Sequence, residues 1–251
     1  MKPLFVRRVL FMTSAFTLSI LLFACNKSIN SMNNNNAPVS GLMAFNLATD
    51  KAATIIVGGS SITNAPLTFE SYTGNYLNVY SGNKLVQSYD YNSNTPLDSV
   101  SYTFEPQKYY SMFVVGSNGH YHNIIVNDNF DSLSPSQTYV RYVNAIADSS
   151  APTVTISSSG DNTTSNSAAF GSVSNFSAVS PGNVTVQVSN GGNINKSRTI
   201  SLDQQKVYTV LLAGTPGSTG NDSLQIKYIE NGTLTQKAQK SSSAVGSMNS
   251  K

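Results

Sequence analysis

Hydrophobic residues along this chain fall in short runs rich in Val, Ile, Tyr, Phe and Thr, and Gly, Asn, Ser and Pro separate the runs. The runs have the length and composition of strands, and no segment shows the helical period of about 3.6 residues. Residues 39–130 are predicted to hold strands at Leu42–Leu47, Ala53–Val57, Tyr76–Tyr80, Leu85–Tyr91, Val100–Phe104, Tyr109–Val115 and Tyr121–Val126. Asn118-Gly119 separates the last two and predicts a two-residue hairpin, because both turn positions need a positive φ. This many short strands in roughly 90 residues is typical of a β-sandwich.

The same pattern of strands occurs twice. Gln107–Gly116 matches Gln205–Gly214 without a gap, and Phe45–Asp50 matches Val143–Asp148 at the same offset, since 205 − 107 and 143 − 45 both equal 98. Two separated segments that share one offset indicate an internal duplication. The duplication predicts a first domain at residues 39–130 and a second at 136–232, each long enough to bury its own core.

Between these matched segments the offset is expected to change. Gly74-Asn75 is paired with Gly182-Asn183, which is an offset of 108. The extra residues are assigned to loops, within Ser157–Ser167 in the second copy and around Asp90–Ser99 in the first. Loops absorb added length at small entropic cost, whereas strands do not.

One tyrosine in each copy has a predicted structural role. Tyr110 and Tyr208 follow an apolar residue, Phe104 and Leu202 respectively, by six positions across a turn. This arrangement resembles the tyrosine corner of Greek-key sandwiches, in which the hydroxyl bonds to the backbone across the turn. The predicted fold class is therefore all-β, with two tandem immunoglobulin-like (Greek-key) β-sandwich domains.

The N-terminus has the pattern of an export signal. Three basic residues precede an apolar stretch over residues 9–23, which is too short to span a membrane. The stretch ends in Leu22-Phe23-Ala24-Cys25, which resembles the bacterial lipobox. We expect a signal peptide at residues 1–24, a lipidated Cys25 that anchors the protein in a membrane, and an Asn/Ser-rich flexible tether over 25–38. Residues 233–251, rich in Ser, Gln and Lys, are expected to form a disordered tail.

Removal of the signal peptide changes the charge of the chain. Lys2, Arg7 and Arg8 are lost with it, which leaves 12 of the 15 basic residues against 12 acidic ones. A mature chain without net charge lacks the basic surface that nucleic acid requires, so nucleic acid is excluded as a partner. Cys25 is the only cysteine, and its lipidation leaves no thiol for disulfides, catalysis or metal binding. No cofactor is expected.

A resemblance to a known family rests on four segments. They are Tyr139–Asp148, Val154–Ile156, Pro181–Val186 and Lys206–Val210, and they look like the bacterial domain-of-unknown-function family numbered 4397. That family typically opens with Val-Arg-x-Val-Asn-Ala-Ser-Pro-Asp, and here Ile146-Ala147 replaces Ser-Pro. The resemblance implies tandem copies over most of residues 40–232 and no catalytic residues, because the family has no established activity. Together with the lipobox and the tether, it resembles a lipoprotein of Bacteroidota, which implies a cell-envelope location in the outer membrane with the periplasmic or external face left open.

The two histidines form a first candidate site. His120 and His122 occupy alternate positions of a predicted strand, so both side chains point to one face and could bind one metal. Asp128 and Asp131 lie close enough in sequence to add oxygen ligands, and residues 127–131 resemble an oxygen-rich calcium loop without its glycine and distal glutamate. The other interpretation is a polar hairpin and linker that bind no metal. A metal-dependent hydrolase that uses His120 and His122 is the alternative function.

The tyrosines provide a second candidate site. Nine of the 13 lie within residues 72–121, and Tyr76, Asn78 and Tyr80 alternate along one predicted strand. On an exposed face these three side chains could stack on sugar rings or contact a protein. The aligned strand of the second copy, residues 184–188, has Val at alternate positions, which is the pattern of an inward face. If the two registers are equivalent, the tyrosines belong to the core, and the sequence leaves both registers open.

Three Asp-Ser-apolar triplets resemble the acceptor for O-glycosylation of exported Bacteroidota proteins. They give Ser99, Ser132 and Ser223 as candidate modification sites. With few residues suited to acid or base catalysis, the sequence favours a non-catalytic, membrane-anchored envelope lipoprotein that acts in adhesion, surface-complex assembly or glycan capture. The expected partners are the membrane, through the lipid anchor, and a glycan or an envelope protein.

Overall fold

The computed structural model describes residues 37–148, 150–158 and 161–235. The predicted signal peptide, the lipidated Cys25, nearly all of the tether and most of the predicted tail lie outside these residues. The described chain is built almost wholly from strands, with two short 3₁₀ turns, η1 (Phe130–Ser132) and η2 (Gly220–Asp222). In this part of the chain, no helix has the length and apolar character needed to cross a membrane.

The strands of repeat 1, predicted at residues 39–130, overlap every run predicted from the sequence, although Tyr76 and Tyr91 lie just outside β5 and β6. They are β1 (Val39–Ala48), β2 (Ala53–Val57), β3 (Ser60–Ser61), β4 (Ser71–Tyr72), β5 (Leu77–Tyr80), β6 (Gly82–Asp90), β7 (Thr95–Phe104), β8 (Tyr109–Ser117) and β9 (His120–Asn127). Asn118 and Gly119 connect β8 and β9 with φ values of 52° and 85°, and Ser117 pairs with His120. The predicted hairpin is therefore confirmed, with both turn residues at positive φ.

Repeat 2, predicted at residues 136–232, contains a corresponding series, whose last strand extends one residue beyond that boundary to Thr233. Its strands are β10 (Thr138–Ile146), β11 (Thr153–Ser158), β12 (Asp161–Ser167), β13 (Ser177–Val179), β14 (Gly182–Ser189), β15 (Asn195–Leu202), β16 (Lys206–Gly214) and β17 (Gln225–Thr233). The segments that match at an offset of 98 occupy equivalent strands, β1 with β10 and β8 with β16.

The strands form four sheets, two in each repeat. In repeat 1, β3-β2-β6-β7 form outer sheet 1, and β4-β1-β8-β9, with β5 also paired to β1, form inner sheet 1. In repeat 2, β12-β11-β14-β15 form outer sheet 2, and β13-β10-β16-β17 form inner sheet 2. Each inner sheet has one parallel pair, β1 with β8 or β10 with β16. Each repeat is a β-sandwich, which confirms the predicted all-β fold with two tandem sandwiches.

Each sandwich has its own core between its two sheets. In repeat 1, Ile55 and Val86 of outer sheet 1 belong to one buried cluster with Leu42 and Met112 of inner sheet 1. In repeat 2, a cluster of the same kind joins β11, β14 and β15 to β10 and β16. These clusters contain the alternate, core-facing residues of the outer strands, as expected for strands with one side in water.

The two predicted tyrosine corners are confirmed. The Tyr110 hydroxyl accepts a hydrogen bond from the backbone amide of Glu105 at 2.9 Å, and the Tyr208 hydroxyl accepts one from Asp203 at 3.0 Å. Both side chains are buried. A third bond of the same form joins the Ser134 amide to the Tyr139 hydroxyl at 3.0 Å, at the entry to repeat 2. Each hydroxyl holds the turn before its strand against the core.

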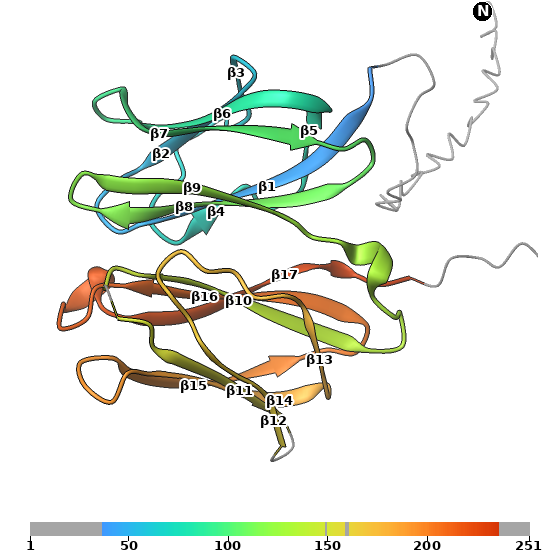
Figure 1. Cartoon of the computed structure of the whole chain (residues 1–251), viewed down its shortest axis with the longest axis vertical. Coiled ribbons are helices and arrows are strands. Elements are labelled where there is room, and N and C mark those ends of the chain that lie inside the picture. Colours follow the sequence, from blue (N-terminus) through green and yellow to red (C-terminus); the bar gives the residue numbers. More distant parts are fainter. Residues whose placement is uncertain (1–36, 149, 159–160, 236–251) are drawn as a thin grey trace, which may run out of the picture. The chain divides into compact units, whose positions relative to one another are not determined.

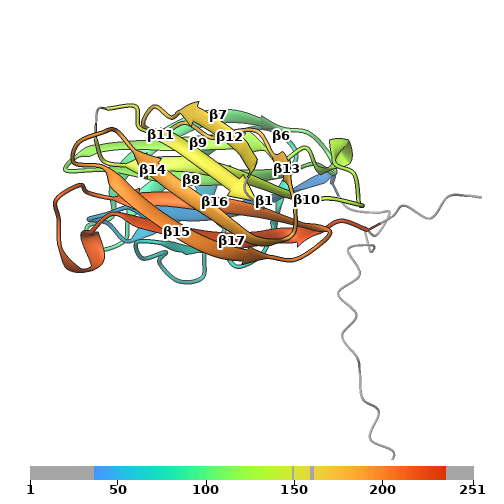
Figure 2. The same cartoon turned by 90° about the horizontal axis from the view of Figure 1, so that it is seen from below.

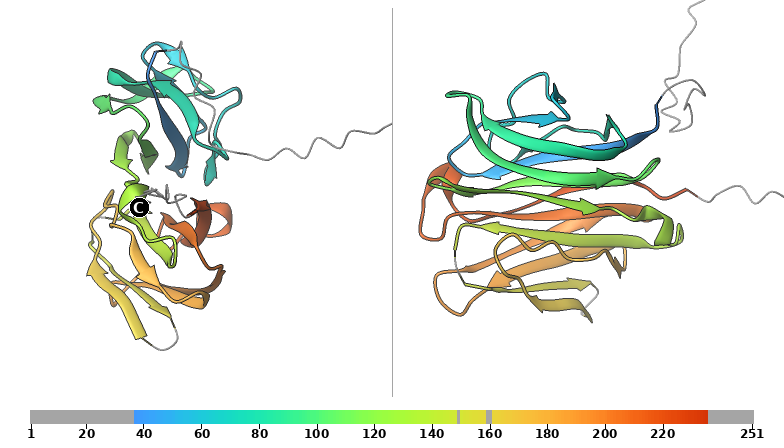
Figure 3. Two further views of the ribbon diagram at one scale, coloured as in Figure 1. Left: turned by 90° about the vertical axis from the view of Figure 1, so that its right-hand side faces the viewer. Right: turned by 45° about the horizontal axis from the view of Figure 1, so that its top comes forward.

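A third core lies between the two inner sheets. β10 is buried at every position and β1 at all but its first, so these strands are covered on both faces. Their second faces form one apolar cluster. At an offset of 98 this cluster pairs four sets of equivalent positions: Phe45 with Val143, Leu47 with Ala145, Phe113 with Leu211, and Val115 with Ala213. Figure 1 and Figure 3 show the sheets as four successive layers, with the two inner sheets in the middle.

One part of the predicted internal alignment is wrong. Gly82 pairs with Phe104 and Gly182 pairs with Leu202, both glycines have positive φ, and both begin equivalent strands. The true offset in this region is therefore 100 rather than 108. Repeat 1 contains two Gly-Asn pairs, Gly74-Asn75 and Gly82-Asn83. The predicted alignment places the first of them opposite Gly182-Asn183, whereas the second is the structural equivalent.

The two segments assigned to loops are largely strand. In repeat 2, β12 occupies residues 161–167 and pairs with β11, as Figure 2 shows. In repeat 1, residues 95–99 begin β7 and pair with β6. The error has a physical reason, because a strand that is exposed on one face or lies at a sheet edge has the Ser-, Thr- and Asn-rich composition of a loop.

Candidate functional site

The side chains of the candidate histidine site do not converge on one point. His120 and His122 are both exposed on β9, and they alternate with the buried Tyr121 and Asn123. Across residues 37–148, 150–158 and 161–235, no group of three or more His, Cys, Asp or Glu side chains is placed to hold a metal ion. The hydrolase hypothesis therefore lacks the converging ligands that it requires in this part of the chain.

The two aspartates of the predicted oxygen-rich loop are engaged elsewhere. Asp128 is fully buried and forms an ion pair with Arg141 of repeat 2, at 2.7 Å between Oδ1 and Nη1. Asp131 lies in the exposed turn η1 and forms an ion pair with Lys108 at 2.7 Å. The two carboxylates thus have different partners, one in the interior and one at the surface.

The predicted row of Tyr76, Asn78 and Tyr80 is divided by the fold. Asn78 and Tyr80 point outward from β5, and Tyr80 is 64% exposed, whereas Val79 is buried. Tyr76 lies one residue before β5 and packs edge-on against Tyr109, with ring centroids 5.0 Å apart. Tyr76 therefore does not join Asn78 and Tyr80 in one exposed row, because its hydroxyl turns inward to Asp128. Ligand binding by Tyr76, Asn78 and Tyr80 stays a prediction.

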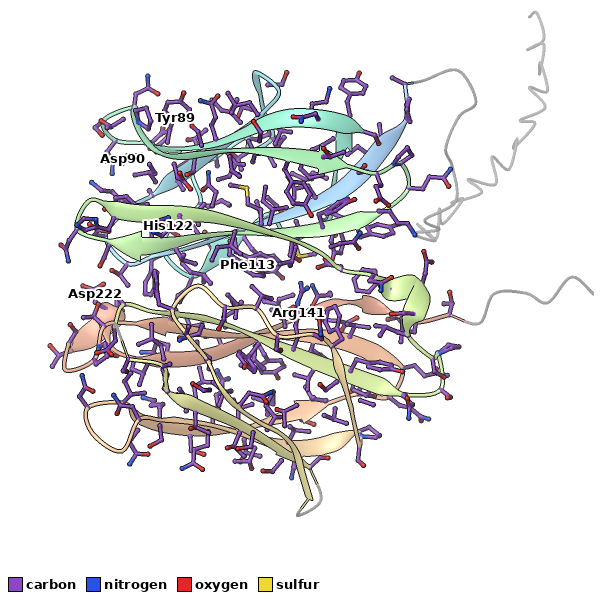
Figure 4. The ribbon with its side chains drawn as sticks, in the orientation of Figure 1. Tyr89, Asp90, Phe113, His122, Arg141 and Asp222 are labelled. Atoms are coloured by element: carbon purple, nitrogen blue, oxygen red, sulfur yellow. The ribbon has the colours of Figure 1, made fainter. Side chains whose placement is uncertain are left out.

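Arg141 is the centre of a buried polar cluster between the repeats. Its Nη1 faces Asp128 Oδ1, its Nη2 donates to Ser111 Oγ at 2.8 Å, and its Nε donates to Thr209 Oγ1 at 3.0 Å. The guanidinium also lies over the Phe176 ring at 4.4 Å from its centroid. Arg141 is 2% exposed, so these contacts replace nearly all of its hydration. Figure 4 shows Arg141 and Phe113 between the two inner sheets.

The hydroxyl and amide groups around this ion pair form a closed chain of hydrogen bonds. Ser111 Oγ donates to Asp128 Oδ2 at 2.8 Å, and the Tyr76 hydroxyl donates to the same oxygen. Asn231 Nδ2 donates to the Tyr76 hydroxyl at 3.2 Å, and Thr209 Oγ1 donates to Asn231 Oδ1 at 2.6 Å. Each hydroxyl thus accepts one hydrogen bond and donates one. Asp128 Oδ2 thus accepts two hydrogen bonds, whereas Oδ1 has the ion-pair contact with Arg141 Nη1 and no well-aligned hydrogen bond. A buried charge pair is better tolerated as more of its donors and acceptors are satisfied.

The environment keeps Tyr76 protonated. Burial, and then the charge and hydrogen bond of Asp128, raise the pKa of the Tyr76 phenol well above its ordinary value. The phenol therefore acts as a hydrogen-bond donor to the carboxylate at physiological pH. This arrangement fits a structural role for Tyr76 better than a role in catalysis.

The cluster is built from equivalent positions of the two repeats. Ser111 corresponds to Thr209, and Asp128 and Asn231 each follow the residue that pairs with the corner tyrosine of their repeat. Tyr76 and Phe176 each stand one residue before the equivalent strands β5 and β13. Arg141 corresponds to Met43, which is buried in the third core. The two inner sheets therefore contact one another through equivalent positions. The charged residues Arg141 and Asp128 stand at positions where the two copies differ.

A second surface stands out on the opposite side of repeat 1. Because Val86 and Ser88 of β6 point into the core, Leu85, Gln87 and Tyr89 point out from outer sheet 1. Leu85 is 47% exposed, and Figure 4 shows Tyr89 on the outer side of this sheet. We name this surface the repeat-1 face. It consists of Ile56, Leu85, Gln87, Tyr89, Ser99 and Ser101.

The three candidate glycosylation sites lie at the surface of different elements. Ser99 is exposed in β7, Ser132 is exposed in η1, and Ser223 is half-buried directly after η2. The Ser132 and Ser223 hydroxyls each donate to the backbone carbonyl three residues earlier. Modification of these serines stays a prediction.

The fold and the shared core define a protein of two tandem β-sandwich repeats. The profile of a family described as "Domain of unknown function (DUF4397)" matches the chain twice, over residues 40–156 and 138–245. These matches together cover more than half of the chain, and the chain belongs to this family. The two matches start 98 residues apart, which is the offset of the internal duplication. No curated protein matches the chain.

The buried cluster could not be located from the sequence, although one signal was present. Arg141 is the only charged residue in β10, where every position is buried. A charge in a strand that is covered on both faces requires a partner of opposite charge. The sequence does not show that β10 is covered on both faces, because that depends on the packing of one repeat against the other.

Proposed function

We propose that this protein is a non-catalytic, lipid-anchored module of the cell envelope, in which two β-sandwich repeats form one rigid unit that binds or supports a partner. The observation that carries the proposal is the third core with its Arg141–Asp128 ion pair. A buried interface of this kind fixes the two repeats to one another. The ionisable groups near it take part in structural contacts, which favours a binding or scaffolding role over acid–base chemistry.

The sequence of the N-terminus supports the anchor. An apolar stretch that ends in Leu22-Phe23-Ala24-Cys25 fits a signal peptide followed by a lipidated cysteine, and acyl chains on Cys25 give stable membrane attachment. We assign the protein to the outer membrane because the residue after Cys25 is Asn26 rather than an aspartate that favours retention in the inner membrane.

Membrane fractionation tests the anchoring part of this proposal. The full-length protein is expected in the membrane fraction, and Cys25→Ser is expected to move it to the soluble fraction because no acyl chain is attached. Ser28→Ala, three residues away in the tether, serves as the control and is expected to leave the protein in the membrane fraction. Retention of Cys25→Ser in that fraction would contradict the proposed lipid anchor.

A further inference from the structure

We propose that the repeat-1 face binds an uncharged glycan chain. The inference rests on the proposed function, because it names the partner that the anchored module would hold. The face lies on outer sheet 1, away from the third core, so that the inner-sheet interface leaves it uncovered.

Repeat 2 shows which side chains the outer sheet needs at these outward positions in order to fold. At an offset of 100, Leu85 corresponds to Thr185 and Tyr89 to Ser189, while Gln87 corresponds to Gln187. Ile56 pairs with Gln87, and Thr155 pairs with Gln187, so Ile56 corresponds to Thr155. Repeat 2 thus forms the same sheet with Thr, Ser and Gln at these outward positions. Ile56, Leu85 and Tyr89 of repeat 1 therefore add exposed apolar surface that the sheet does not need in order to fold.

The repeat-1 face carries no outward charge. The charged residues of β2, β3, β6 and β7 are Lys84, Asp90 and Asp98, and all three occupy core-side positions of their strands. Asp90 pairs with Lys51, and Asp98 accepts a hydrogen bond from the Asn123 backbone amide at 2.6 Å. A face of this kind has nothing to pair with the charges of a polyanion or of a charged peptide. It matches a ligand that is itself uncharged.

Polar groups on the face are positioned beside the apolar ones. Gln87 Nε2 donates to the Tyr89 hydroxyl at 3.0 Å and to Ser99 Oγ at 3.3 Å, so the amide lies between the ring and the hydroxyl of the next strand. Leu85 and Tyr89 are four residues apart on β6, which corresponds to about 13 Å along an extended strand. A sugar chain has apolar C–H faces and hydroxyl edges. A strip of ring, methyl, amide and hydroxyl groups is complementary to both.

The small apolar area of the repeat-1 face favours a glycan over a second protein as its ligand. A stable protein interface buries about 800 Å² on each partner, with a closely packed apolar centre. The repeat-1 face offers three large apolar side chains, Ile56, Leu85 and Tyr89, of which Ile56 and Tyr89 are half-buried in their own sheet. A flat chain of sugar rings needs less area and fewer apolar anchors than a protein partner.

Affinity electrophoresis of the full-length protein in detergent tests this inference, with native gels that contain dextran, mannan, galactomannan or xyloglucan. At least one of these uncharged polysaccharides is expected to retard the wild-type protein. Leu85→Thr with Tyr89→Ser, which installs the residues of repeat 2 at equivalent positions and should therefore fold, is expected to weaken the retardation at least tenfold. Thr185→Ala with Ser189→Ala, at the equivalent positions of repeat 2, is the matched control and is expected to retain binding.

Three outcomes would overturn the inference. They are no retardation in any of the four gels, equal retardation of the wild type and the double variant, and a wild-type dimer in analytical ultracentrifugation that the double variant loses. The last outcome would assign the face to a second copy of the chain. None of these results depends on fractionation of Cys25→Ser, so a failure of glycan binding and a failure of lipid anchoring are distinguished.

Discussion

At the scale of single residues, the interface between the repeats depends on a few positions at which the copies differ. Repeat 1 has Met43 where repeat 2 has Arg141, and the charge of Arg141 is balanced by Asp128 of repeat 1. An ion pair removed from water contributes little net stability, but it makes the structure sensitive to the loss of one partner. Because the pair joins one residue from each repeat, it also favours the pairing of repeat 1 with repeat 2 over the pairing of two identical faces.

Replacing Arg141 with the residue of the other copy tests this role. Arg141→Met is expected to lower the free energy of unfolding by about 3–5 kcal/mol, because it leaves the Asp128 carboxylate buried without a partner. Adding Asp128→Asn is expected to restore a large part of the loss, since the double variant has no buried charge. Urea denaturation measures both effects.

Lys108→Met provides the matched control for a surface ion pair. It removes the exposed pair with Asp131, and its effect should be much smaller than that of Arg141→Met. Equal losses for Arg141→Met and for the double variant with Asp128→Asn would show that the buried pairing is not the cause.

At the scale of elements, the close packing around Gly116 of β8 and Gly214 of β16 explains why both matched segments, Gln107–Gly116 and Gln205–Gly214, end in glycine. Gly116 and Gly214 have φ values of 123° and 105°. A Cβ on Gly116 would lie 2.0 Å from the His120 carbonyl oxygen, and one on Gly214 would lie 2.3 Å from that of Ser223. Both obstacles are backbone atoms, one at the first residue of β9 and the other two residues before β17. Only glycine allows this close approach.

Gly116→Ala is therefore expected to destabilise the β8–β9 hairpin strongly. The backbone conformation alone costs about 1–3 kcal/mol, and displacement of the His120 carbonyl adds to that cost. Gly119→Ala in the same hairpin is the control, because φ is also positive but an added Cβ would meet no atom within 4 Å. Thermal denaturation should give a clearly larger decrease in Tm for Gly116→Ala. A larger decrease for Gly119→Ala would contradict the argument from close approach.

At the scale of the whole molecule, the third core joins the two sandwiches into one cooperative unit. Two separate sandwiches would each leave one face of the inner sheet in water, whereas here β1, β8, β10 and β16 are covered on both faces. Unfolding of either repeat would expose the apolar inner face of the other. The free energy of this exposure couples the two repeats.

The folded chain is therefore expected to unfold in one calorimetric transition, with equal calorimetric and van't Hoff enthalpies. Ile55→Ala in the core of repeat 1 should lower the stability by about 2–5 kcal/mol, and amide hydrogen exchange should accelerate in β14 of repeat 2 as well. Two separate transitions, with β14 unaffected by Ile55→Ala, would show that the repeats unfold independently.

The sequence by itself determined most of the strands, the hairpin at Asn118-Gly119, the duplication at an offset of 98 and the corner tyrosines Tyr110 and Tyr208. These features depend on alternation over a few residues, on turn chemistry or on similarity between two segments, and all of these are visible along the chain. The tertiary structure decided that the second face of each inner strand is covered, that Tyr76 turns toward Asp128, and that Asp128 meets Arg141 while His120 and His122 lie exposed on β9. These outcomes depend on contacts between residues of different repeats, and no local pattern in either repeat specifies them.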